Sequence, residues 1–199
     1  GPTATLQHSS GFEFVMRAAL FPVLIGALVL AIAAPAANAA PGMQVGIADD
    51  GITQRTPDLA ASVVPQWKTV GVDAARVLVI WAYVAPGADR TVRPSGFDPS
   101  NPNDPQYNWA PVDQVVNLLT AQGIDPILNI TGFMPFWGSQ DPAQRNSRYK
   151  PDPAQFAVFA KAVAQRYAGR VHRYILWNEP NLPLWLQPQN TCSGGRCRP

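Results

Sequence analysis

Four short apolar runs rich in β-branched residues alternate with three helical patterns in this chain. The runs cover residues 43–48, 75–81, 126–130 and 171–177. Each has the length of a strand, and periodic helical segments separate them. Strands that alternate with helices pair in parallel, because a right-handed crossover helix returns the chain to the same end of the sheet. The sequence therefore predicts an α/β fold with a parallel sheet.

The helical segments carry their own start and stop signals. The first spans residues 56–71, opens with Thr-Pro and contains Pro65, which we expect to kink or split it. The second, residues 111–123, places four apolar side chains at i, i+3, i+4 and i+7 and ends at a glycine. The third, residues 152–169, opens at Asp152 with a capping-box pattern and also ends at a glycine.

Two parallel folds fit this order of elements, a doubly wound sheet and a (β/α)8 TIM barrel. The positions of the polar and aromatic residues favour the barrel. These residues follow the carboxyl ends of the strands, and in a barrel all of these ends lie at the catalytic face. These residues are Asp49, Trp81, Tyr83, Trp137, Asn178 and Glu179. Four strands cannot close a barrel. We therefore expect a half barrel truncated after strand 4, with residues 40–199 forming the N-terminal half of a catalytic domain.

The first 39 residues are typical of a leader. Met16 and Arg17 precede an apolar run over residues 18–34 and a small-residue cleavage site at 37–39, the order of a secretory signal peptide. An uncleaved membrane anchor is the alternative, because about 17 apolar residues is the lower limit for a span. Residues 1–15 show no pattern and are interpreted as upstream or non-native sequence. We expect a secreted, extracellular protein that meets the membrane only during export.

Charge and cysteine content narrow the possible ligands. The formal net charge is +2 and no Lys/Arg cluster occurs, so nucleic acid is not expected as a partner. Cys192 and Cys197 are the only cysteines, and their spacing suits a local disulfide in a secreted protein. His172 is the only histidine after the leader. We therefore predict neither a metal site nor a cofactor.

The segment with the clearest chemistry is residues 177–181, where an apolar strand runs into Asn178 and Glu179. A carboxyl group among the Trp and Leu side chains nearby would be partly desolvated, the condition under which it stays protonated and serves as a general acid. Neighbouring residues of a regular strand point to opposite faces. Both side chains can therefore reach one ligand only if the strand becomes irregular at this point.

Residues 177–182, with the sequence WNEPNL, and the following Trp185 resemble the acid/base motif of the clan A retaining glycoside hydrolases, which lies at the end of the fourth barrel strand. The segments NLPLW at 181–185 and GFMP at 132–135 are most similar to family 39, the β-xylosidase and iduronidase family. Secreted family 5 cellulase-like proteins resemble the chain next best. They usually carry a histidine at the end of the third strand, where this chain has ITG at 130–132.

The resemblance implies a secreted retaining β-glycosidase that hydrolyses plant-type oligo- or polysaccharides of the xyloside or glucoside class. Glu179 would be the general acid/base, and Asn178 would contact the sugar 2-hydroxyl. Arg76 would orient the nucleophilic carboxylate, although a structural ion pair is the alternative, because a buried arginine needs an anionic partner. The resemblance places the nucleophile on the seventh strand, beyond residue 199. We therefore expect this fragment to be inactive on its own.

Several further residues are candidates for substrate binding. Flat aromatic faces match the apolar faces of pyranose rings, and core packing is the alternative for each of the four candidates, Trp81, Tyr83, Trp137 and Trp185. Asp49 is a candidate substrate contact, although the Asp-Asp-Gly sequence at 49–51 is also typical of a turn. Two non-enzymatic functions remain as alternatives, a non-catalytic secreted carbohydrate-binding protein and a membrane-anchored surface protein.

Overall fold

The computed structural model describes residues 40, 42–194 and 196–198. The expected upstream segment, residues 1–15, and the expected signal peptide, residues 16–39, lie outside these residues. Residues Gln44–Pro199 form a compact unit that contains all the helices and strands named below. No helix in the described part of the chain is long and apolar enough to cross a membrane.

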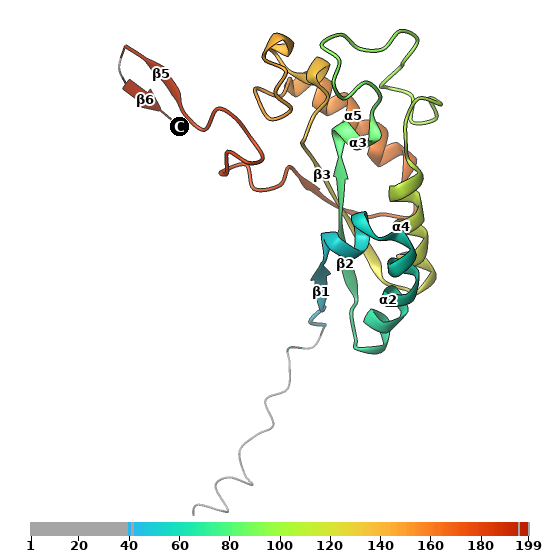
Figure 1. Cartoon of the computed structure of the whole chain (residues 1–199). Coiled ribbons are helices and arrows are strands. Elements are labelled where there is room, and N and C mark those ends of the chain that lie inside the picture. The colour runs from blue at the N-terminus through green and yellow to red at the C-terminus, as the bar shows by residue number, and fades with distance from the viewer. Residues whose placement is uncertain (1–39, 41, 195, 199) are drawn as a thin grey trace, which may run out of the picture. The chain divides into compact units, whose positions relative to one another are not determined.

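Four parallel strands form the main sheet, in the order β1-β2-β3-β4 (Figure 1). They are β1 (Gly46–Ala48), β2 (Ala74–Ile80), β3 (Asp125–Thr131) and β4 (Arg173–Leu176). The predicted parallel α/β sheet is thereby confirmed. The strands also follow chain order without the reversal that marks a doubly wound sheet. The sheet is consistent with part of a TIM barrel, whereas truncation of a barrel stays a prediction.

Helices connect consecutive strands. They are η1 (Gly51–Arg55), α2 (Pro57–Thr69), α3 (Trp81–Val84), α4 (Ala110–Ala121), η2 (Phe136–Gly138), η3 (Pro142–Gln144) and α5 (Pro153–Arg166). The expected split at Pro65 is wrong, because α2 continues through it as one helix. The Asp152 side chain caps α5 by accepting from the backbone N–H groups of Ala154 and Gln155. A separate hairpin, β5 (Thr191–Ser193) and β6 (Arg196–Arg198), follows the main sheet in the chain.

Helices α2, α4 and α5 pack on one face of the sheet and form the core with it (Figure 1). Alternate residues of β2 and β3 point into this core, as the period-2 geometry of a strand requires. Helix α4 buries the four residues of its predicted apolar face, Val112, Val115, Val116 and Leu119. The long segment between α3 and α4 contains no helix or strand, yet it adds Phe97, Tyr107 and Trp109 to the core.

The opposite face of the sheet carries polar side chains among the apolar ones. By strand register, Arg76 and Leu78 of β2 lie beside Ile127 and Asn129 of β3 on this face. In a closed barrel this face would line the interior, and its carboxyl end would be the catalytic end. The polar residues of the sheet therefore lie on the face where a barrel would have its site.

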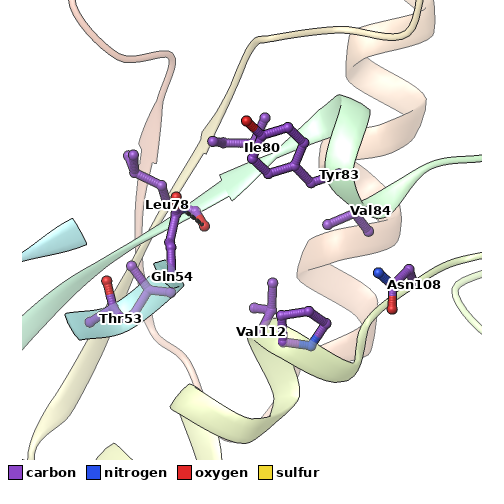
Figure 2. Close-up of a pocket in the computed structure, with 10 residues that line it drawn as sticks. Thr53, Gln54, Leu78, Ile80, Tyr83, Val84, Asn108 and Val112 are labelled. Carbon is purple, nitrogen blue, oxygen red and sulfur yellow. Dashed lines mark hydrogen bonds between the residues drawn. The ribbon is translucent and has the colours of Figure 1, made fainter. Parts of the chain in front are cut away.

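A small apolar cavity lies between η1, the end of β2, α3 and the start of α4 (Figure 2). Its volume is about 130 Å³. Val77, Val84 and Val112 contribute buried side chains to its wall.

Candidate active site

The chain leaves β4 in an irregular conformation. The Trp177 backbone N–H still donates to the Ile130 carbonyl at 2.8 Å, which continues the ladder of the sheet by one residue. Trp177 then adopts a left-handed φ of +66°, and Glu179 a φ of +42°. The predicted loss of regularity is therefore present. The Trp177 ring lies against Gly132, where a Cβ atom would lie only 2.8 Å from the indole, so a larger residue would displace the ring.

Asn178 is the buried centre of a hydrogen-bond network, and only 7% of it is exposed. Its Oδ1 accepts from Arg76 Nη1 at 3.0 Å and from Asn129 Nδ2 at 3.2 Å. Its backbone N–H donates to Thr131 Oγ1 at 2.9 Å. Its Nδ2 lies 3.4 Å from Oε2 of Glu179. Two donors on Oδ1 set the orientation of the amide, because an acceptor oxygen must face them.

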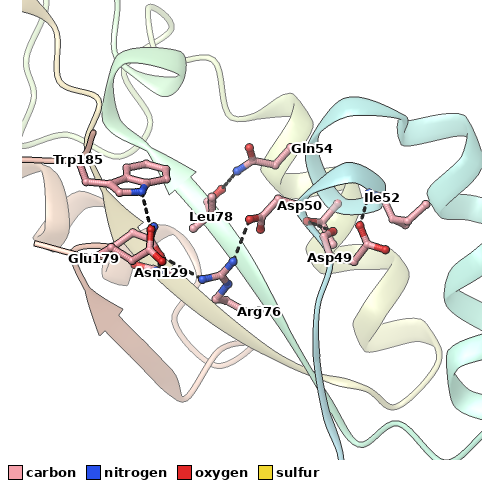
Figure 3. Close-up of polar contacts among 11 residues, drawn as sticks. Asp49, Asp50, Ile52, Gln54, Arg76, Leu78, Asn129, Glu179 and Trp185 are labelled. Carbon is pink, nitrogen blue, oxygen red and sulfur yellow. Dashed lines mark hydrogen bonds and ion pairs between the residues drawn. The ribbon is translucent and has the colours of Figure 1, made fainter. Parts of the chain in front are cut away.

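Arg76 joins this network to the loop after β1. Its Nη2 forms an ion pair with Asp50 Oδ2 at 2.8 Å (Figure 3). The side chains of Arg76 and Asp50 are 27% and 35% exposed. The anionic partner of this partly buried arginine is thus Asp50, in an ion pair at the site itself. Buried atoms Nε of Arg76, Oδ1 of Asp50 and Oδ1 of Asn129 have no hydrogen-bond partner among the described residues.

Glu179 lies at the surface beside an aromatic stack. Its Oε2 accepts from Trp185 Nε1 at 2.8 Å. The Trp185 ring stacks on Phe133, with centroids 5.2 Å apart and planes at 9°, and the Arg148 guanidinium lies 4.3 Å from the Phe133 centroid. The desolvated environment that we expected for Glu179 is not present among the described residues, because both Glu179 and Leu184 are exposed.

A cavity of about 410 Å³ lies next to these residues. Tyr83, Phe133 and Trp185 supply its aromatic surface, and Asp50 connects it to the Arg76 network. Two of the four aromatic candidates, Tyr83 and Trp185, line this cavity. The lining consists of Asp50, Gln54, Leu78, Ile80, Tyr83, Phe133, Leu184 and Trp185.

The other two aromatic candidates lie in the hydrophobic core. Trp81 is 1% exposed and stacks on Phe159 of α5, with centroids 5.6 Å apart and planes at 12°. Trp137 packs edge-on against Trp81 and donates its indole N–H to the Pro86 carbonyl. The sugar-stacking role expected for Trp81 and Trp137 is wrong, because neither ring presents a free face.

Asp49 belongs to the turn after β1. Its Oδ1 accepts from the backbone N–H of Ile52 at 3.1 Å, and its carbonyl accepts from Thr53. These are the hydrogen bonds of a turn, which was the alternative interpretation of the Asp-Asp-Gly sequence. The expectation that Asp49 contacts substrate is corrected accordingly, because Asp50, the next residue, is the one that faces Arg76.

Sequence reasoning missed four residues of the site, namely Asp50, Asn129, Thr131 and Phe133. An amide within the apolar run of residues 126–130 is a signal that could have identified Asn129, because buried polar groups require partners. Phe133 lies in the family-like GFMP segment but has no distinguishing pattern of its own. Asp50 could not be separated from Asp49 without the tertiary structure.

The remaining site expectations concern metal ions and cysteines. Within the described residues, no group of three or more His, Cys, Asp or Glu side chains is arranged to hold a metal ion. Cys192 is disulfide-bonded, and its register partner in the β5–β6 hairpin is Cys197.

No protein-family model matches the chain, and no curated protein matches it. Among solved structures, it is similar to a family 39 glycoside hydrolase from the gut symbiont Bacteroides cellulosilyticus WH2, with a TM-score of 0.39 and 19% identity over 69% of this chain. It is also similar to Fpglu1 from Fervidobacterium pennivoraus, with a TM-score of 0.45 and 19% identity over 65% of this chain. The chain spans 25% and 33% of the lengths of these two structures.

Proposed function

We propose that this chain supplies the acid/base side of the active site of a secreted retaining β-glycosidase that acts on xyloside- or glucoside-type plant oligo- or polysaccharides. The observation that carries the proposal is the Asn178–Glu179 pair just past the carboxyl end of β4. The Asn178 amide is buried and held by donors from β2 and β3, whereas the Glu179 carboxylate is accessible. The fixed amide could hydrogen-bond a sugar hydroxyl, and the accessible carboxyl group beside it could protonate the leaving group.

In this proposal Glu179 first protonates the departing glycosidic oxygen and then accepts a proton from the attacking water. Asn178 Nδ2 carries two N–H groups, one of which faces Glu179. The second N–H group has no acceptor among the described residues. In this proposal it contacts the sugar 2-hydroxyl. This contact strengthens as the oxocarbenium-like transition state forms.

Retaining hydrolysis also needs a nucleophilic carboxylate, roughly 5–5.5 Å from the acid/base. In this proposal the nucleophile lies outside residues 40–199. The chain alone would then bind sugar without hydrolysing it. The unpartnered Nε of Arg76 supports this placement, because it is a buried donor to which a further carboxylate could be bound. Arg76 would then orient the nucleophile while Asp50 holds its Nη2.

Export by residues 16–39 is part of the same proposal. A signal peptide would bring the enzyme to extracellular polysaccharide. N-terminal sequencing of exported protein should begin near Ala40, whereas retention of residues 16–39 would favour the membrane-anchored alternative.

The test uses the protein expressed from its complete gene with Glu179→Gln. A general acid matters most when the leaving group is poor. Hydrolysis of an unactivated β-glycoside should therefore fall by about 10²–10⁴-fold, whereas a dinitrophenyl glycoside should lose far less in its glycosylation step. Asp89→Asn, which removes an exposed carboxylate elsewhere, is the matched control. Equal losses for both leaving groups would contradict the acid/base assignment.

The alternative is a non-catalytic carbohydrate-binding protein. The observation that favours it is the aromatic cavity, since the rings of Tyr83 and Trp185 line it and sugar stacking needs no second carboxylate. If the complete wild-type protein binds oligosaccharides but hydrolyses none of them, this alternative replaces the enzyme.

A further inference from the structure

We propose that Arg148 is a positioning residue for Glu179, because it fixes the part of the chain that holds Trp185 against the Glu179 carboxylate. The inference rests on the proposed function, in which Glu179 is the acid/base. Glu179 is exposed, and its Oε2 accepts from Trp185 Nε1 at 2.8 Å, whereas the Asn178 amide lies farther away, at 3.4 Å. Figure 3 draws the contact with Trp185. The position of the carboxylate therefore depends on what holds Trp185.

The chain after β4 is docked on the loop between β3 and α5 through Gln187. The backbone N–H of Gln187 donates to the Arg148 carbonyl at 2.8 Å, and its carbonyl accepts from the Lys150 N–H at 2.7 Å. Its side-chain Oε1 accepts from Asn146 Nδ2 at 2.9 Å. These three hydrogen bonds hold the chain two residues beyond Trp185, so the Trp185 ring itself needs other contacts.

The Arg148 side chain supplies the contacts nearer the ring. Its Nε donates to the carbonyl of Leu184, the residue before Trp185, at 2.7 Å. Its guanidinium lies 4.3 Å from the centroid of Phe133, the ring on which Trp185 stacks. One half-buried side chain thus binds both the backbone beside Trp185 and the stacking partner of its indole. A guanidinium suits both contacts, because it is planar, carries N–H donors in its plane and stacks on rings with its face.

Arg145 provides a matched control, because it makes the same two kinds of contact elsewhere. Its Nη2 donates to the Asp89 carbonyl at 3.2 Å, and its guanidinium lies 5.3 Å from the Phe136 centroid. Neither partner belongs to the chain after β4. Replacement of either arginine by glutamine therefore removes one positive charge and similar contacts, but only Arg148→Gln should release Trp185.

The first experiment measures amide hydrogen exchange in the whole chain by mass spectrometry. Arg148→Gln should speed exchange at the backbone N–H groups of residues 184–187 at least about fivefold, because this segment loses a docking contact. Arg148→Lys should speed it similarly, since an ammonium group keeps the charge but lacks the planar fork that reaches the Leu184 carbonyl while stacking on Phe133. Arg145→Gln should leave exchange in this segment unchanged. Circular dichroism establishes that each variant is folded.

Exchange at the same rate in wild type and Arg148→Gln would overturn the inference. Exchange at the wild-type rate in Arg148→Lys would also overturn it, because the charge alone would then account for the effect of Arg148.

The second experiment measures hydrolysis by the protein from the complete gene. In Arg148→Gln, kcat for an unactivated β-glycoside should fall about fivefold while KM changes less than about twofold, because a displaced carboxyl group protonates the leaving group less well. A dinitrophenyl glycoside should lose less in its glycosylation step, since its leaving group needs little protonation. Arg145→Gln should keep the wild-type kcat. Equal losses for both leaving groups, or a loss confined to KM, would overturn the positioning role.

The two experiments separate this inference from the proposed function. A complete protein that hydrolyses neither glycoside would contradict the proposed function, and with it any role of Arg148 in acid catalysis. Exchange at residues 184–187 would still decide whether Arg148 fixes this segment. Faster exchange together with unchanged hydrolysis would show that the segment does not position Glu179, and would overturn the inference while leaving the proposed function intact.

Discussion

Arg76 on β2 donates from Nη1 to Oδ1 of Asn178 at 3.0 Å, although 102 residues separate them in the chain. Strand β3 lies between their two strands, and its Asn129 supplies the second donor to the same oxygen. The orientation of one amide thus depends on three parallel strands. Because Glu179 follows Asn178 directly, the same contacts restrict where the candidate acid/base can lie.

Asp50→Asn should weaken the network by removing the charge opposite Arg76. We expect the free energy of unfolding to fall by about 1 kcal/mol, because both side chains are partly exposed and solvent screens their attraction. Asp125→Asn is the matched control, since Asp125 pairs with Arg173 at similar exposure. Urea unfolding measures stability, and sugar binding should weaken only in Asp50→Asn. Equal weakening in both variants would contradict a site-specific role for Asp50.

Trp185→Phe should lower the rate of hydrolysis by the protein from the complete gene. The indole N–H donates to the Glu179 carboxylate at 2.8 Å and so restricts where this group can lie. Without this hydrogen bond, kcat for an unactivated β-glycoside should fall about fivefold, the rate equivalent of about 1 kcal/mol. Phe133→Leu disturbs the stack but leaves the N–H in place, so its kcat should fall less. Equal losses in both variants would indicate a general effect of the stack.

Trp81→Ala and Tyr83→Ala should have different consequences, although both residues lie on α3. Trp81 is buried against Phe159, and its loss should cost about 3–5 kcal/mol of stability. Tyr83 is exposed, and its loss should cost less than about 1 kcal/mol while weakening ligand binding. Chemical denaturation and ligand titration measure the two effects. A stable Trp81→Ala variant would contradict the core assignment.

Tyr107 should make the fold sensitive to alkaline pH. Burial, followed by the charges of Asp104 and Asp98, raises the pKa of the Tyr107 hydroxyl well above its usual value. Above pH of about 10 the unfolded chain ionises this tyrosine while the folded chain does not. The free energy of unfolding should therefore fall as pH rises above about 10.

The check is Tyr107→Phe, which removes the hydrogen bond to the Pro99 carbonyl and lowers stability at neutral pH. Its free energy of unfolding should then fall less steeply between about pH 9 and 11 than that of the wild type. Tyr83→Phe, at an exposed residue, is the matched control. A slope that is the same in wild type and Tyr107→Phe would exclude Tyr107 as the cause.

Strand and helix identity followed from periodicity, but the ends of the strands did not. The observed β1 and β4 are shorter than the predicted runs at residues 43–48 and 171–177. Both are edge strands of the described sheet, and each pairs with a single neighbour. The two central strands, β2 and β3, have neighbours on both sides and match their predicted runs to within one residue.

The sequence by itself determined that an Asn-Glu pair follows the fourth strand of a parallel α/β sheet, because apolar runs and helical periodicity identify the elements and their order locally. Tertiary structure alone decided which side chains meet there. Asp50 rather than Asp49 faces Arg76, and Trp81 packs in the core whereas Tyr83, two residues later, lines a cavity. Side-chain direction within a turn or a short helix depends on partners brought from distant parts of the chain, such as Phe159 against Trp81. Such distant partners cannot be identified from a local sequence pattern.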